Sequence, residues 1–91
     1  MGWYRKQPTV VEAHQVGVEI VGDILRWILA GGATAQLVVH AGSHTGIEVH
    51  TLEGVMTANP GDWIIKDIAG EFYPCRDDIF QQTYSEVAGP T

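Results

Sequence analysis

Apolar and polar residues recur with two different periods along this chain, and the change of period predicts where a helix gives way to strands. Over residues 18–30 the apolar side chains follow the spacing of one helix face: Ile20, Val21, Ile24, Leu25, Ile28 and Leu29. Glu19 and Asp23 lie near the start of this segment, and Gly31-Gly32 follows its end. We expect a helix over 18–30, with Gly22 allowing close packing against a sheet.

The segments on both sides of this helix have features typical of strands. Residues 9–16 are rich in β-branched side chains, and Pro8 suits a strand entrance after an extended lead-in over residues 1–8. Residues 36–40 and 46–50 alternate around a turn-rich segment, which predicts a hairpin with His40 paired near Gly46. This pairing gives one apolar face, Leu37, Val39, Ile47 and Val49, and an opposite face of Gln36, Val38, His40, Glu48 and His50.

Turn signals divide the C-terminal half of the chain into shorter strands. Glu53-Gly54 predicts a two-residue hairpin turn before a strand at 55–58. The tetrapeptide Asn59-Pro60-Gly61-Asp62 predicts a type II turn, because Pro60 suits position i+1 and Gly61 supplies the positive φ of position i+2. We expect strands at 63–68, 71–74 and 83–87, with a tight turn at Ala69-Gly70.

A short helix is expected between the last two of these strands. Asp77 or Asp78 would cap it, and it would continue through Gln82. Residues 88–91 are expected to form a frayed tail. The whole order predicts an α+β fold: a single domain over 1–91, with an antiparallel curved β-sheet and one main α-helix packed on it.

Charge and cysteine content narrow the classes of function. Eleven Asp and Glu against five Lys and Arg give a net charge of -6, and the cations are scattered. Duplex nucleic acid and anionic membranes are bound by rows of cations, so neither is an expected partner. Cys75 is the only cysteine, which excludes an intrachain disulfide and favours a reducing compartment. Without a signal segment or a long apolar run, we expect a soluble cytoplasmic protein.

The residue types that carry catalysis or bind metals do not form a recognisable site. The spacing of the four histidines, His14, His40, His44 and His50, favours solvent-facing or hydrogen-bonded side chains over a metal site. Cys75 is expected to be a small, packed hydrophobic side chain. The carboxylates of Glu53, Glu71, Asp77 and Asp78 have no acid–base spacing. We therefore expect no cofactor, no metal and no enzymatic activity.

The aromatic residues suggest a binding role instead. Trp3 in the lead-in and Trp63 beside the turn are the tryptophans expected to be partly exposed. An exposed ring beside a cation can stack on a nucleobase while the cation meets a phosphate, or it can anchor a protein interface. The predicted ligand- or partner-binding residues are Trp3, Arg5, Lys6, Trp63, Lys66 and Tyr73.

Longer motifs in the chain resemble one family. They are the run from Pro60 to Lys66, Gly70-Glu71-Phe72-Tyr73-Pro74-Cys75, Asp78-Ile79-Phe80 and Thr83-Tyr84. Together with the opening segments 4–6 and 11–15, they resemble the small phage and prophage proteins of the PGDYG type. The chain departs from that pattern with Trp63 in place of tyrosine, Asp67 in place of glycine and Asp77 in place of proline. The resemblance implies a bacteriophage origin and a location in the cytoplasm of a bacterial host.

These observations predict a non-enzymatic phage accessory protein that acts by binding. Its ligand would be a small molecule, such as a nucleotide signal of host defence, or a host protein. Two alternatives stay open: a structural or assembly component of the virion, and a small hydrolase that uses Cys75 or a histidine. A small domain with one helix leaves sheet edges to cover, so we also expect a homodimer.

Overall fold

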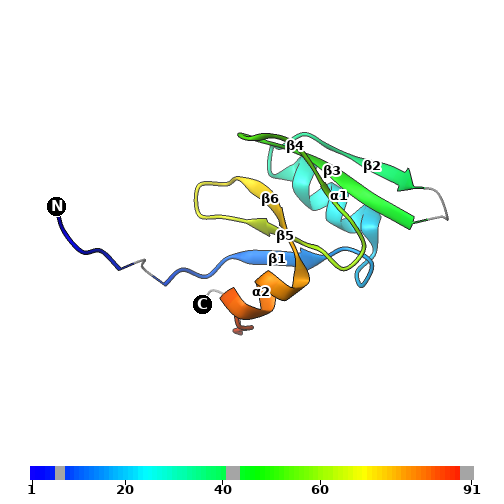
Figure 1. Ribbon diagram of the computed structural model, residues 1–91. Helices are drawn as coiled ribbons and strands as arrows, with labels where there is room; N and C mark the ends of the chain where they lie inside the picture. Colours follow the sequence, from blue (N-terminus) through cyan, green and yellow to red (C-terminus); the bar gives the residue numbers. More distant parts are fainter. Residues whose placement is uncertain (6–7, 41–43, 89–91) are drawn as a thin grey trace.

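The strands and helices follow one another in the predicted order, apart from a last strand that was expected at 83–87. The computed structural model describes residues 1–5, 8–40 and 44–88. Its elements are β1 (Glu12–Gln15), α1 (Val21–Ala30), β2 (Ala35–His40), β3 (His44–Thr51), β4 (Gly54–Ala58), β5 (Trp63–Lys66), β6 (Phe72–Cys75) and α2 (Asp77–Thr83). The predicted α+β fold is confirmed, and Figure 1 shows α1 beside β2 and β3.

The strands form two antiparallel sheets rather than the single curved sheet that was expected. One sheet has the order β1-β5-β6 and the other β2-β3-β4. The turn between β4 and β5 explains the division. In that turn the amide of Gly61 donates to the carbonyl of Val16 at 2.8 Å, and the amide of Val16 donates to the carbonyl of Asp62 at 2.9 Å. These bonds direct β5 onto β1, so the chain changes sheets at this point.

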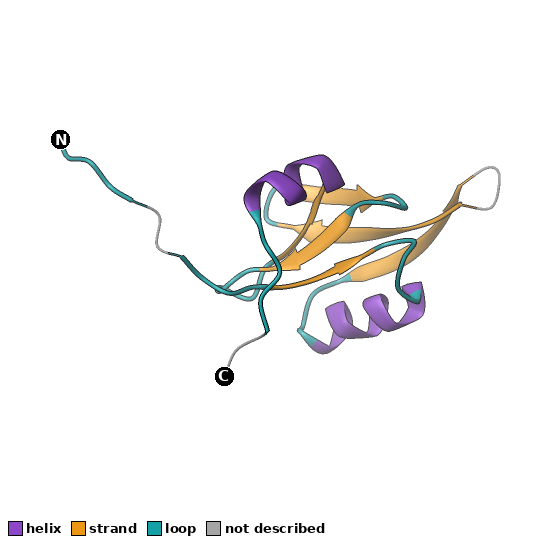
Figure 2. Ribbon diagram, turned by 90° about the horizontal axis from the view of Figure 1, so that it is seen from below, coloured by secondary structure: helices purple, strands orange, loops and turns teal. Residues whose placement is uncertain are grey.

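The core lies between α1 and the two sheets. Its buried members come from both sheets, from α1 and from the residue after β1: Val16, Ile24, Ile28, Ile47, Val49, Ala58, Ile64 and Phe72. Trp27 packs edge-on against Phe72, with ring centroids 5.0 Å apart. The longer helix, α1, and the shorter one, α2, lie on opposite sides of the strands (Figure 2).

The predicted helix is confirmed, but it begins at Val21 instead of Val18. Gly17 has a φ of 88° and begins a tight turn with Val18, so Val18 is not part of the helix. Val18 and Ile20 are exposed as a result. Gly22 does not mark a close approach to a sheet, because a Cβ atom placed there would meet nothing within 4 Å. That expectation was wrong.

The β2–β3 hairpin has the expected faces in a different register. His40 pairs with His44, and Gly46 pairs with Val38. The predicted pairing was displaced by two residues, and a shift of two keeps every side chain on its own face. Leu37 therefore lies opposite Ile47, where the predicted pairing placed Val49, and it keeps the expected face. Leu37 is 43% exposed and Ile47 fully buried. The core does not extend to the far end of β2.

Two predicted turns have different outcomes. Thr51 pairs with Gly54, so the β3–β4 turn is formed by Leu52 and Glu53, one residue earlier than expected. The Asn59–Asp62 turn is confirmed. Its closing bond runs from the amide of Asp62 to the carbonyl of Asn59 at 2.9 Å, and Gly61 has a φ of 99°.

The two ends of the chain differ from prediction. Residues 1–5 and 8–11 form an extended lead-in that runs away from the body (Figure 1). The expected strand at 83–87 is absent from the described residues: Thr83 ends α2, and Tyr84–Val87 have no regular structure. Neither Asp77 nor Asp78 caps α2, whose N-cap is Arg76. Residues 89–91 of the predicted tail lie outside the described residues.

The two described helices can be compared with the length and apolar character of a helix that crosses a membrane. Neither α1 nor α2 has the length and the apolar run that a membrane-crossing helix requires.

Candidate functional site

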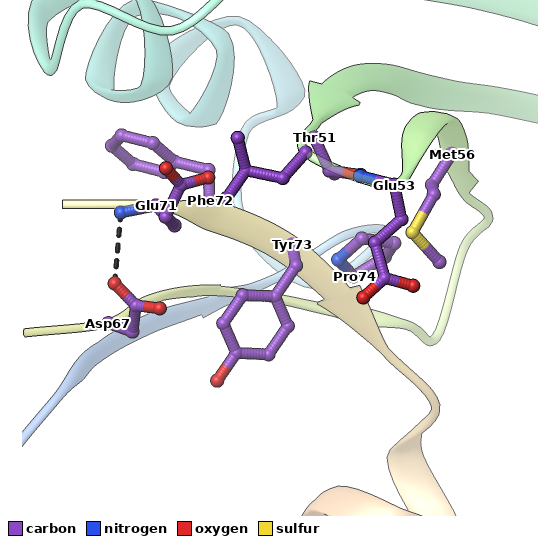
Figure 3. A pocket seen from close by; sticks show the side chains of 9 residues that line it. Thr51, Glu53, Met56, Asp67, Glu71, Phe72, Tyr73 and Pro74 are labelled. Carbon is purple, nitrogen blue, oxygen red and sulfur yellow. Dashed lines mark hydrogen bonds between the residues drawn. The ribbon is translucent and has the colours of Figure 1, made fainter. Parts of the chain in front are cut away.

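A groove separates the β3–β4 turn from β6, the edge strand of the other sheet. Its volume is about 320 Å³, at the small end of the roughly 300–1,000 Å³ that ligand pockets span. One side is lined by Thr51, Leu52, Glu53 and Met56, and the other by Asp67, Glu71, Phe72, Tyr73 and Pro74. Figure 3 shows Glu53 and Met56 next to Pro74, with the ring of Tyr73 pointing away from the β3–β4 turn.

Side-chain bonds within the two turns fix the shape of this groove. The hydroxyl of Thr51 donates to the carbonyl of Gly54 at 2.8 Å and accepts from the amide of Glu53 at 3.1 Å. On the other side, Oδ1 of Asp67 accepts from the amides of Ala69 and Glu71, both at 2.9 Å (Figure 3). Each turn is therefore held locally, and each places a glutamate at the rim of the groove.

The rim is acidic and the remainder is largely apolar. The carboxylates of Glu53 and Glu71 form no hydrogen bond or ion pair with the described residues, whereas that of Asp67 is occupied by its turn. Leu52 is 86% exposed and Met56 41%. No described Lys or Arg lines the groove. Its chemistry suits an amphipathic cationic group, whose stem can cover apolar surface while its charge meets a carboxylate.

The edge of β6 limits how a ligand can bind here. Pro74 lies in the middle of this strand, and proline has no N–H to donate to an added strand. Side chains rather than a continuous backbone ladder therefore have to make the contacts in the groove.

The structure does not bring the predicted binding residues together. Trp3 and Arg5 are exposed on the lead-in, and Lys6 lies outside the described residues. Trp63 and Tyr73 share one face of their sheet. Trp63 and Ile65 are two residues apart on β5 and so lie on the same face, and Ile65 pairs with Tyr73. Lys66 belongs to the opposite face, with its Nζ 5.6 Å from the centre of the Phe72 ring. Among the members of the predicted set that the structure describes, only Tyr73 lines the groove.

Trp63 has a structural role at the base of α2. Its ring stacks on Phe80, with centroids 3.9 Å apart and planes inclined by 7°. Its Nε1 donates to Oδ1 of Asp77 at 2.9 Å, and this bond together with one from Gln81 lowers the pKa of Asp77. The indole therefore attaches α2 to the sheet.

Tyr73 and Cys75 both have raised pKa values. Burial, followed by the hydroxyl of Tyr84 3.5 Å away, raises the pKa of Tyr73, which keeps its hydroxyl protonated. Burial and the charges of Asp62 and Asp78 raise the pKa of Cys75. A protonated thiol is a poor nucleophile, so this environment does not favour covalent catalysis by Cys75.

Among the histidines whose side chains the structure describes, His14 lies in a defined cluster. Its Nδ1 lies 2.7 Å from a carboxylate oxygen of Glu19 and its Nε2 lies 2.8 Å from one of Glu12, while its ring packs edge-on against Trp27. The carboxylates occupy different nitrogens of the ring, so the three groups do not point at a common centre. Among the described residues no set of three or more His, Cys, Asp or Glu is arranged to hold a metal ion.

The spacing of the rim glutamates, Glu53 and Glu71, marks no acid–base pair, so they are not predicted as site residues from the sequence. The signal that points to them is their position beside turn glycines: Glu53 precedes Gly54, and Glu71 follows Gly70. Only the packing of the two sheets shows that these turns face one groove. Comparison with protein-family models, with curated proteins and with solved structures found no match for this chain.

Proposed function

We propose that this protein is a non-enzymatic binding protein whose groove receives a basic, aromatic segment of a protein partner. The observation that carries the proposal is the pair of rim carboxylates, Glu53 and Glu71, which lack partners among the described residues and flank an apolar floor. Charged groups of this kind at a rim favour association with a complementary surface and steer the encounter.

The groove favours a protein partner over a nucleotide. Three carboxylates line it and repel phosphate, and no described cation there offsets them. The net charge of -6 acts in the same direction. Of the two kinds of ligand expected for a binding protein, a basic polypeptide segment is the better match.

The proposed setting is a bacteriophage protein that acts on a protein in the cytoplasm of its bacterial host. The resemblance of segments such as 60–66 and 70–75 to the PGDYG type supports this setting. The raised pKa of Cys75 supports a binding role over the hydrolase alternative.

Calorimetric titration with two synthetic peptides tests the groove. One peptide alternates arginine and tyrosine, and the other has glutamate in place of arginine. We expect binding of the arginine peptide that weakens with added salt, and no binding of the glutamate peptide. The double variant Glu53→Gln/Glu71→Gln should weaken binding roughly 5- to 10-fold, as two exposed ion pairs are worth about 1–1.4 kcal/mol together.

The matched control removes the same two charges elsewhere. Glu48 lies on the outer face of β3, where it accepts a bond from Gln36, and Glu86 lies beyond α2. The variant Glu48→Gln/Glu86→Gln should bind the arginine peptide nearly as well as the wild type. Equal weakening by both double variants would mean that net charge alone causes the binding, and the groove would not be the site.

A further inference from the structure

One described cation lacks a counterpart, and it lies in the lead-in. Arg26 pairs with Asp23, Arg76 pairs with Asp78 at 2.8 Å, and Lys66 lies over the ring of Phe72. Arg5 forms no ion pair with the described residues. The two residues before it are aromatic and fully exposed, Trp3 at 101% and Tyr4 at 95%.

The lead-in therefore carries the positive charge that the described lining of the groove lacks. It presents a guanidinium beside two large rings, and the groove presents two glutamates beside exposed Leu52 and Met56. Arginine pairs with carboxylates through a planar fork, and tryptophan and tyrosine are the side chains most favoured at the centre of protein interfaces. The two surfaces are complementary in charge and in apolar area.

The path of the chain favours docking between two copies. The lead-in leaves from β1, at one edge of the β1-β5-β6 sheet, and the groove lies along β6 at the other edge. Figures 1 and 2 both show the lead-in running away from the body rather than around it. The eleven residues before β1 reach at most roughly 36–40 Å when fully extended.

We propose that the lead-in of one copy docks in the groove of a second copy, and that the exchange is reciprocal. Arg5 pairs with Glu53 and Glu71 of the other copy, while Trp3 and Tyr4 cover its Leu52 and Met56. A reciprocal exchange closes on itself with two-fold symmetry, so it ends at a dimer. The inference rests on the proposed function, because it assigns an occupant to the same groove.

Sedimentation equilibrium of the full chain with two variants tests this exchange. The lead-in variant is Trp3→Ser/Arg5→Ser, and the groove variant is Glu53→Gln/Glu71→Gln. The wild type should approach twice its chain mass of 9.9 kDa as concentration rises. Each variant alone should dissociate at least 10-fold more readily. All of these residues are exposed or at the groove rim, and far-UV circular dichroism should show both variants folded.

Mixing the two variants gives the decisive result. A mixed pair retains one intact lead-in facing one intact groove, which is one of the two contacts of the wild-type dimer. Association should therefore recover in part in the mixture, although neither variant associates well alone. No recovery would overturn the exchange. A wild-type dimer that survives in both variants would also overturn it, because another surface would then hold the dimer.

The remaining outcomes separate this inference from the proposed function. If the groove binds the arginine peptide while the wild type stays at 9.9 kDa at all concentrations, the proposed function stands and the exchange is wrong. If the difference in tryptophan emission between the wild type and a Trp3→Phe variant shows groove-dependent burial of Trp3 at every concentration in a monomer, the lead-in occupies its own groove. That result also overturns exchange between copies.

Discussion

Gly31, the C-cap residue that follows α1, lies directly against the ring of Phe72. A Cβ atom at Gly31 would be 2.5 Å from Cζ of that ring and 2.6 Å from Cε2. The φ of Gly31 is -79°, which any residue can adopt, so this position requires glycine for space. The next residue, Gly32, has a φ of 89° and requires glycine for its backbone conformation. Two adjacent glycines thus serve different physical needs.

The substitution Gly31→Ala should destabilise the fold. Phe72 is buried in the core, and its ring contacts Trp27, so it cannot move without disturbing other packed side chains. Overpacking of this kind costs roughly 1–3 kcal/mol of unfolding free energy. Urea denaturation followed by circular dichroism measures the change.

Gly22→Ala provides the matched control for that experiment. Both changes add one methyl group to a glycine in or beside α1, but at Gly22 the methyl group meets nothing within 4 Å. Alanine is favoured over glycine by up to about 1 kcal/mol in a helix interior. Gly22 lies in the first turn of α1, so this variant should be at least as stable as the wild type. Equal effects of the two substitutions would contradict the packing argument.

The substitution Gly61→Val should also destabilise the fold, for a different reason. A Cβ atom at Gly61 has open space, so the cost comes from holding a β-branched residue at a φ of 99°. We expect a loss of roughly 1–3 kcal/mol. Gly61→Asn should lose less, because asparagine tolerates positive φ. Thermal unfolding of both variants checks the order, and a Val variant as stable as the wild type would rule out the assigned turn.

Local patterns were sufficient to predict α1 and the faces of the β2–β3 hairpin. The stripe that includes Ile24 and Ile28 repeats with the helical period, and both residues are buried. The hairpin faces survived an error in register because side-chain direction depends only on whether the shift is even or odd. These features depend on residues close together in the sequence.

The division into two sheets and the groove could not be predicted in this way. The division depends on the bonds between Val16 and the turn at Gly61-Asp62, which are far apart in the sequence. The groove depends on two turns that meet only after the sheets pack. The strand expected at 83–87 failed for a related reason: Tyr84 stacks on Phe80, with ring centroids 5.0 Å apart, instead of joining a sheet edge.

The attachment of α2 gives a further prediction. No residue of this helix is fully buried, and it lacks a side-chain cap, so its position depends on the stacked rings of Trp63 and Phe80. Phe80→Ala should cost roughly 1–3 kcal/mol, less than the 3–5 kcal/mol of a fully buried phenylalanine. It should also reduce the near-UV circular dichroism of the tryptophans.

Ile79→Ala is the control for this helix. Ile79 is 49% exposed on the same turn, so its removal should change stability by less than about 0.5 kcal/mol. If both substitutions cost the same, stability in this region would come from helix formation rather than from the stack on Trp63.

The cluster around His14 makes stability depend on pH. Ionised carboxylates only accept hydrogen bonds, so the contacts with Glu12 and Glu19 require both ring nitrogens of His14 to donate. Partial burial of His14 lowers its pKa, but the bonds and charges of Glu12 and Glu19 together raise it above 6.5. Asp23, which lines the same small hollow beside Trp27, adds a further negative charge although it is paired with Arg26.

The sign of the effect follows from the direction of that shift. Because the folded pKa lies above the unfolded value of 6.5, protonated His14 stabilises the fold fully below pH 6.5, and this contribution is lost as the pH rises through the folded pKa. His14→Gln should therefore lower stability more below pH 6.5 than well above it. Proton NMR titration should find a folded pKa that falls in Glu19→Gln, because one acceptor then loses its charge. A His14→Gln penalty that grows with pH would reverse the sign. It would refute the contact of a protonated His14 on β1 with Glu19, which lies before α1.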